Sequence, residues 1–121
     1  MGYERHHAII VTDRGYGDFI QRAHREAMKI FMGRVSGIIP SAINGNKSFF
    51  VAPDGSKEGW AVSDRGDADR AEFKAFLRSF EYPDGSTRLA WVEVQYGDDE
   101  METIVTDDSD ATRREMEDEE E

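Results

Sequence analysis

The chain has 121 residues, enough for one domain, and its lack of cysteine excludes disulfides, thiolate metal sites and a cysteine nucleophile. Its 26 acidic and 15 basic residues give a formal net charge of −11, which argues against direct binding to nucleic acid. No apolar run approaches the roughly 18 residues of a membrane-spanning helix, and the first 14 residues lack the pattern of a signal peptide. We therefore expect a soluble cytoplasmic protein with no membrane partner.

The first predicted element is a strand over residues 6–12, whose apolar residues occupy both alternating sets. This pattern is typical of a central strand covered on both faces. A helix is predicted from Asp18, which forms a capping-box pattern with Gln21, to a stop at Gly33. Its apolar residues recur three and four positions apart: Phe19, Ile20, Ala23, Ala27, Ile30 and Phe31.

A hairpin is predicted next, from two short segments on either side of a tight turn. Residues 35–40 and 48–52 are apolar or β-branched, and Asn44-Gly45 between them favours positive φ angles. A further turn at 53–55 precedes a brief strand predicted at 60–62.

A second helix is predicted from an N-cap at Asp67 to a stop at residues 83–85. Its apolar residues also follow helical spacing: Ala68, Ala71, Phe73, Phe76, Leu77 and Phe80. Residues 89–96 alternate as a strand does, and residues 103–106 are the last predicted strand.

The predicted order of elements is βαββαββ, which indicates an α+β domain. We expect a mostly antiparallel sheet with two helices on one face, and the first six elements match the order of a ferredoxin-like fold. The predicted domain covers residues 1–106, and residues 107–121 are predicted to be an acidic, flexible tail.

The charge is distributed unevenly along the chain. Residues 1–97 hold 13 acidic and 13 basic residues, whereas residues 98–121 hold 13 acidic residues and only Arg113 and Arg114. A block of like charge is typical of an interaction tail, because it repels itself and attracts basic surfaces; a solubility tail without a partner is the alternative. The residues predicted to bind a partner are Asp98, Asp99, Glu100, Glu102, Asp107, Asp108, Asp110, Glu117, Asp118 and Glu119.

Tests for metal and catalytic sites are negative at the sequence level. His6 and His7 point to opposite faces of a strand, and His24 fits a satisfied histidine at the core boundary. Residues 54–59 resemble the start of a calcium loop, but Arg65 stands where a bidentate glutamate belongs. We therefore predict no metal, no cofactor and no enzymatic activity. Basic residues of the first helix, Arg22, Arg25 and Lys29, are interpreted as solvated or as an intramolecular dock for the acidic tail.

Three stretches carry a resemblance: residues 7–12 (HAIIVT), 48–60 (SFFVAPDGSKEGW) and 91–98 (WVEVQYGD). They resemble a family of small accessory proteins encoded by tailed bacteriophages and prophages, and the likeness covers roughly residues 6 to 98. The family carries no settled activity, so the resemblance transfers no catalytic or binding residue. It implies action inside a bacterial cell, and small acidic phage proteins often inhibit host proteins, some by imitating the charge of DNA.

The leading hypothesis is a non-enzymatic phage-type protein that binds and modulates a host protein, in defence or nucleic-acid handling, through an acidic, DNA-mimic-like surface. One alternative is a binder that sequesters a nucleotide-like signal with Asn44, Lys47 and Trp60. Another is a structural or assembly protein of a virion or of a host complex, in its simplest form a homodimer through a sheet edge.

Overall fold

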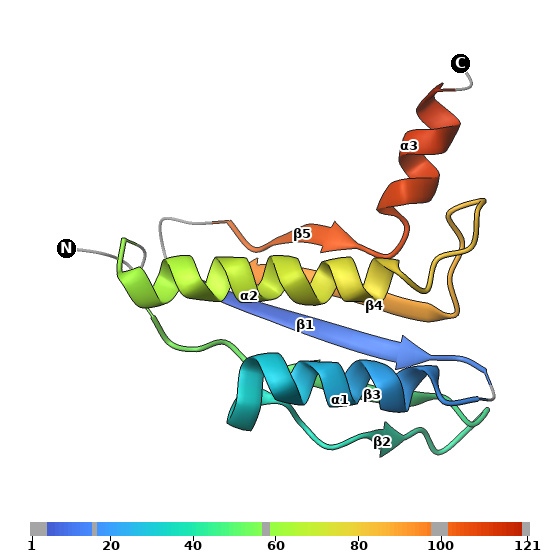
Figure 1. The fold of residues 1–121 in the computed structure, drawn as a ribbon, viewed down its shortest axis with the longest axis horizontal. Helices are drawn as coiled ribbons and strands as arrows, with labels where there is room; N and C mark the ends of the chain where they lie inside the picture. The colour runs from blue at the N-terminus through green and yellow to red at the C-terminus, as the bar shows by residue number, and fades with distance from the viewer. Residues whose placement is uncertain (1–4, 16, 57–58, 98–101, 120–121) are drawn as a thin grey trace.

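The structure is a computed structural model that describes residues 5–15, 17–56, 59–97 and 102–119. It is an α+β fold with one five-stranded antiparallel sheet and three α-helices (Figure 1). The strands are His6–Asp13 (β1), Ile39–Pro40 (β2), Lys47–Val51 (β3), Leu89–Tyr96 (β4) and Ile104–Asp108 (β5). The α-helices are Phe19–Phe31 (α1), Ala61–Arg78 (α2) and Ala111–Glu119 (α3), and a 3-10 turn, Met32–Arg34 (η1), follows α1.

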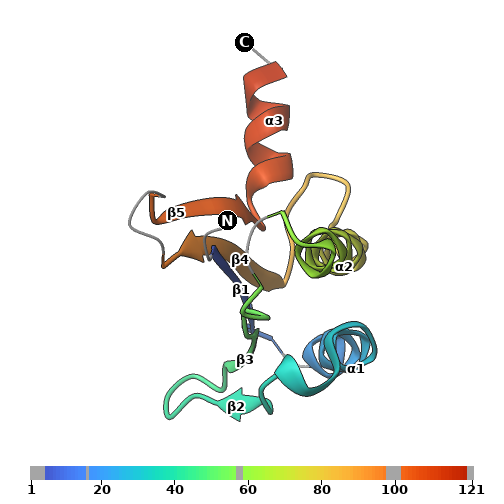
Figure 2. The same ribbon diagram turned by 90° about the vertical axis from the view of Figure 1, so that its left-hand side faces the viewer.

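The strands lie in the order β2-β3-β1-β4-β5, so the β-branched first strand is central. Ile10 of β1 pairs with Phe50 of β3 on one side and with Val92 of β4 on the other. Figure 2 shows α1 and α2 on the same side of this sheet. Among the described elements, none lies on the opposite side.

The core lies between the sheet and the two helices. Both helices contribute the apolar stripes that the sequence pattern indicates, and Phe31 of α1 meets Phe73 of α2 edge to face at 5.6 Å. The buried apolar residues are Ile9, Val11, Ile20, Ala23, Ala27, Phe31, Phe49, Val51, Phe73, Leu77, Phe80, Leu89 and Trp91. Because each large side chain in such a core contributes roughly 1.5–3 kcal/mol, these contacts dominate the stability of the fold.

The second helix begins earlier than predicted. The strand predicted at 60–62 is wrong, because Ala61 and Val62 belong to α2. The carbonyl of Trp60 accepts hydrogen bonds from the amides of Ser63 and Asp64, so helical bonding starts there. Asp67 lies inside the helix and pairs with Arg70 instead of capping the N-terminus. Residues 61–66 are therefore helical, although their composition is also compatible with a strand followed by a helix cap.

The hairpin turn was predicted correctly, but the element before it is shorter than predicted, and the strand after it begins and ends one residue earlier. Asn44 and Gly45 have φ angles of 68° and 66°, as the turn requires. Only Ile39–Pro40 of the segment 35–40 forms a strand. At the start of α1, Asp18 makes no side-chain capping bond, so the predicted capping box is not formed.

The C-terminal segment also differs from the prediction. Residues 107–121 were expected to be a flexible tail, but Asp107 and Asp108 complete β5, and α3 follows. The pairing of β5 with β4 fixes Asp107 and Asp108 in the sheet instead of in a flexible tail, because their backbone groups bond to β4. Within the described part of the chain, no helix has the length and apolar character needed to cross a membrane.

Candidate functional site

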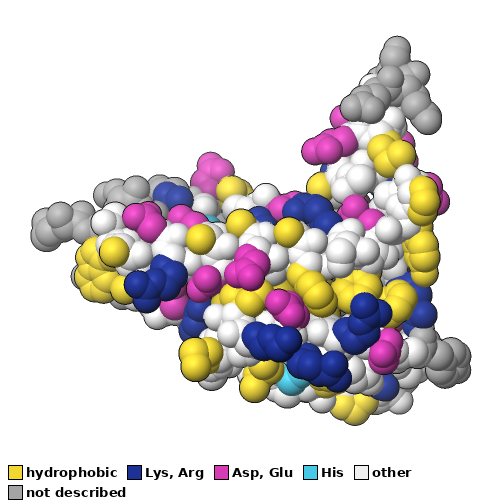
Figure 3. Space-filling view, viewed as in Figure 1, with side chains coloured by type: hydrophobic (Ala, Val, Ile, Leu, Met, Phe, Trp, Pro, Cys, Tyr) yellow, Lys and Arg dark blue, Asp and Glu magenta, His cyan; other side chains and the backbone are white. Residues whose placement is uncertain are grey.

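The acidic segment follows one edge of the sheet and then leaves it. Glu102 is exposed just before β5, and Asp110 is exposed in the turn before α3. Figure 1 shows α3 projecting away from the sheet and the other two helices, and Figure 3 shows acidic side chains on it. Asp98, Asp99 and Glu100, also predicted to bind a partner, lie outside the described residues.

Asp107 was predicted to bind a partner, but it belongs to an ion-pair cluster beneath α2. We use this name for Arg70, Lys74, Arg78, Glu93 and Asp107. The carboxylate oxygens of Asp107 lie 2.6 Å from a guanidinium nitrogen of Arg78 and 3.1 Å from the Lys74 ammonium nitrogen. The same Lys74 ammonium lies 3.0 Å from Glu93, and Arg70 lies 3.2 Å from the other oxygen of Glu93. Three cations one helical turn apart therefore hold two carboxylates from adjacent strands.

Burial and the surrounding cations act in opposite directions on Asp107. Partial burial alone raises the pKa of its carboxyl, but hydrogen bonds and positive charge from Arg78 and Lys74 outweigh that effect and lower the pKa. Asp107 is therefore an ionised internal partner of α2 at neutral pH. It is not available to an external protein unless the cluster opens.

Asp108 connects the sheet edge to the base of α3. Its carboxylate accepts a hydrogen bond from Arg114 at 2.9 Å, and this bond is the main reason that the pKa of Asp108 is lowered. Thr112 donates a hydrogen bond to Glu81 at 3.0 Å. Gly85, at φ 83°, lies against the backbone of Arg113. The first turn of α3 is therefore attached to β5 and to the turn before β4.

The remainder of α3 is exposed and acidic. The side chains of Glu115, Glu117 and Asp118 are all exposed, and the last turn of the helix contains no basic residue. The C-terminal end of a helix carries partial negative charge, so acidic side chains there cost about 0.3–1 kcal/mol each at low ionic strength. A cationic surface placed against α3 would remove this cost.

Among the described residues, the basic side chains of α1 do not contact the acidic segment. Arg22 lies 4.9 Å above the ring of Phe80, and Lys29 is 4.0 Å from Glu26. The structure places β5 and α3 at the opposite edge of the sheet from α1 (Figure 2). The intramolecular dock predicted on α1 is thus wrong, and α2 provides it instead.

The three residues predicted to bind a small ligand do not meet. Asn44 is in the exposed hairpin turn, and Lys47 of β3 lies opposite Asp13 of β1 in the strand register, at the same end of the sheet. Trp60 precedes α2 at the other end (Figure 1). Asn44 instead borders a shallow hollow with Arg14 and Gly15.

The described residues contain no group of three or more potential metal ligands. The ring of His24 donates a hydrogen bond to the carbonyl of Ser36 at 2.8 Å and meets Phe49 edge to face. Asp54 accepts bonds from the backbone and hydroxyl of Ser56, which forms a local turn. These contacts give His24 and Asp54 structural roles.

Sequence reasoning missed the ion-pair cluster, although two signals pointed to it. Arg70, Lys74 and Arg78 recur every four residues, and they therefore lie on one helix face. Glu93 is the only charged residue of the strand 89–96. What could not be read was that these two features face each other.

Comparison with models of known protein families, with curated proteins and with solved structures found no match.

Proposed function

We propose that this chain is a non-enzymatic, phage-type accessory protein that binds and modulates a basic host protein through the acidic surface of α3. It would act in the cytoplasm of a bacterial host cell, and its carboxylates would stand in for nucleic-acid phosphates. The observation that supports the proposal is the exposure of Glu115, Glu117 and Asp118 on a helix that leaves the body of the protein.

The geometry refines which acidic residues take part. Asp107 and Asp108 are engaged by Arg78, Lys74 and Arg114, so they position α3 rather than bind the partner. The binding residues are those beyond the first turn of α3, together with exposed Asp110. A helix of nine residues is marginal by itself in water, so a partner that lies along it would also stabilise its conformation.

The test is a comparison of two charge-neutralised variants in a pull-down from bacterial lysate. Glu117→Gln with Asp118→Asn removes two charges from α3, and Asp64→Asn with Glu72→Gln removes two exposed charges from α2. We expect mass spectrometry to find a basic protein that the wild type and the α2 variant retain and the α3 variant loses. Binding of the purified partner should weaken steeply as salt rises.

Equal loss of the partner in both variants would show that only net charge matters, and retention by both would remove α3 from the mechanism. Either result contradicts the proposal. Full retention at about 1 M salt, where the Debye length is about 3 Å, would also contradict an electrostatic interface.

We also propose that the elements from β1 to β4 form a ferredoxin-like unit. In support, α1 connects β1 to β2 with β3 lying between these strands, and α2 connects β3 to β4 with β1 between them. This scaffold hosts many unrelated functions and does not select one. The proposed function therefore depends on the additions, β5 and α3.

A further inference from the structure

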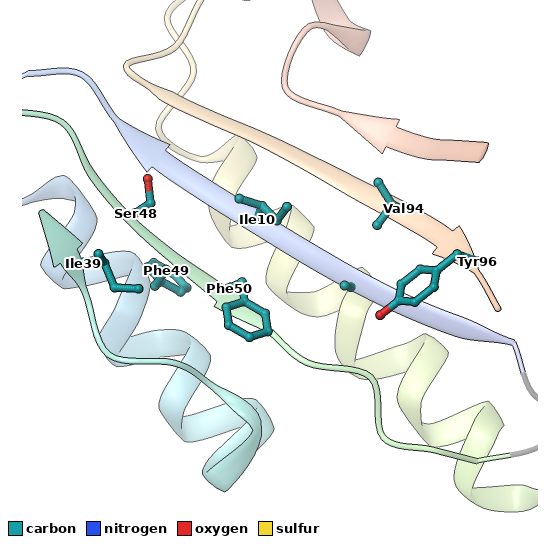
Figure 4. A pocket seen from close by; sticks show the side chains of 8 residues that line it. Ile10, Ile39, Ser48, Phe49, Phe50, Val94 and Tyr96 are labelled. Carbon is teal, nitrogen blue, oxygen red and sulfur yellow. The ribbon is translucent and has the colours of Figure 1, made fainter. Parts of the chain in front are cut away.

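The face of the sheet away from the helices is apolar. We call it the open face and define it by Ile10, Phe50, Val92, Val94, Tyr96 and Val105. Phe50, Ile10 and Val92 are direct partners across β3, β1 and β4, so they form one continuous apolar row. Ile10 is 45% exposed and Phe50 is 44% exposed. Figure 4 shows the side chains of Ile10, Phe50, Val94 and Tyr96 in front of the sheet, with the helices behind it.

The alternation of β4 makes this face unusual. The side of β4 that meets the helices carries Leu89 and Trp91 but also Glu93 and Gln95, whereas the other side is apolar throughout, with Ala90, Val92, Val94 and Tyr96 pointing to the open face. A sheet with one solvated face normally places its polar residues outward. The more apolar set of β4 therefore lies on the side that no described helix covers.

We propose that the open face is the interface of a symmetric homodimer, in which it packs against the same face of a second copy. This inference goes beyond the proposed function and does not rest on α3. The described strands contain 28 residues, and each residue occupies about 16 Å² of a flat sheet. The two faces together would bury about 900 Å², without the additional area of protruding side chains. This buried area is close to the roughly 1,000 Å² that a specific interface needs.

Charge and shape favour a second copy over another protein. The chain carries a net charge of −11, yet among the described residues the histidine and carboxylate side chains at or bordering the open face are His6, Asp108 and Asp110, and Asp108 pairs with Arg114. A basic partner gains little from such a surface. A hollow of about 360 Å³ lies over Ala8 and Ser48 and is bordered by Phe50 and Tyr96. Raised and hollow regions on one face can interlock about a two-fold axis.

The experiment is sedimentation velocity on the full chain from about 1 to about 100 µM, where an interface of this size is expected to associate. We expect a concentration-dependent species of twice the 13.8 kDa chain mass. Ile10→Lys should weaken dimerisation at least about tenfold, because it buries a charge in the interface. Met28→Lys is the matched control, since Met28 is also 45% exposed but lies on α1.

A second measurement covers the case in which Ile10→Lys fails to fold. Because the chain has no cysteine, Ile10→Cys and Met28→Cys each introduce a single thiol. A bismaleimide that spans the about 10 Å between packed sheets should link copies of the Ile10→Cys protein and not those of Met28→Cys. A wild type that stays monomeric across the range, an undiminished dimer of folded Ile10→Lys, or equal linking of both thiols would overturn the proposal.

Discussion

Replacing Lys74 with methionine tests the ion-pair cluster most directly. The Lys74 ammonium lies 3.0 Å from Glu93 and 3.1 Å from Asp107, so the two carboxylate oxygens are no more than about 6 Å apart. At an effective dielectric constant of about 20, two unit charges at that separation repel by about 2.7 kcal/mol. Removal of one partner of a buried ion pair typically costs about 3–5 kcal/mol.

The remaining contacts reduce that cost. Glu93 keeps Arg70 and the hydroxyl of Thr106 at 2.8 Å, and Asp107 keeps Arg78. We therefore expect Lys74→Met to lower the free energy of unfolding by about 2–3 kcal/mol at pH 7, or the melting temperature by roughly 10 °C. Urea denaturation followed by circular dichroism measures this difference. The difference should shrink as the pH falls through the lowered pKa of Asp107, because protonation of that carboxyl removes the repulsion.

Lys29→Met is the control for the loss of one lysine from a helix surface. Lys29 is 69% exposed and 4.0 Å from Glu26, so its replacement should change stability by no more than about 0.5 kcal/mol. If Lys74→Met unfolds at the same urea concentration as Lys29→Met, the cluster does not stabilise the fold and the reasoning is refuted.

Three further predictions concern the core, the base of α3 and acid stability. Phe73→Ala should cost about 3–5 kcal/mol in the same urea assay, because Phe73 is fully buried; a loss below about 1 kcal/mol would contradict the described packing. Gly85→Ala should detach α3, because the residue has φ 83° and its new methyl group would lie 3.1 Å from the Arg113 amide. Detachment should speed tryptic cleavage after Arg113 or Arg114, and an unchanged cleavage rate would refute the prediction. The free energy of unfolding should be steady from pH 7 to about pH 5 and fall below about pH 4. The pKa values of Asp107 and Asp108 are lowered from 3.8, so the stability that these groups contribute is present above that value and is lost as the pH falls through their folded-state pKa. Urea denaturation at a series of pH values measures this loss, and an equal loss in acid for Asp107→Asn and the wild type would count against this assignment.

Local patterns were sufficient for much of the fold. The apolar stripe from Phe19 to Phe31 and the alternation of residues 89–96 are periodic over many positions, so α1 and β4 were predicted with nearly correct limits. Asn44-Gly45 was identified as a turn because few other residue pairs adopt its backbone angles. The start of α2 was misplaced because residues 60–66 fit several structures equally well, and the helix was selected by its surroundings.

The candidate site was predicted less well, because the distribution of charge along the sequence does not show which distant residues contact one another in the fold. The sequence located the excess negative charge at residues 98–121 but treated its members alike. Only pairing between β4 and β5 places Asp107 under Lys74 and Arg78, while Glu117 and Asp118 remain exposed on α3.

The α+β class, the main helices and strands, and the concentration of charge at the C-terminal end follow from amino-acid patterns along the chain, because these are properties of short segments. Which carboxylates are neutralised and which face of the sheet stays uncovered depends on the three-dimensional fold. Both depend on strand order and helix placement, and these bring together residues that are distant in the chain. Ile10 shows the limit: its strand is apolar on both sides, and only the position of α1 and α2 determines which side is buried.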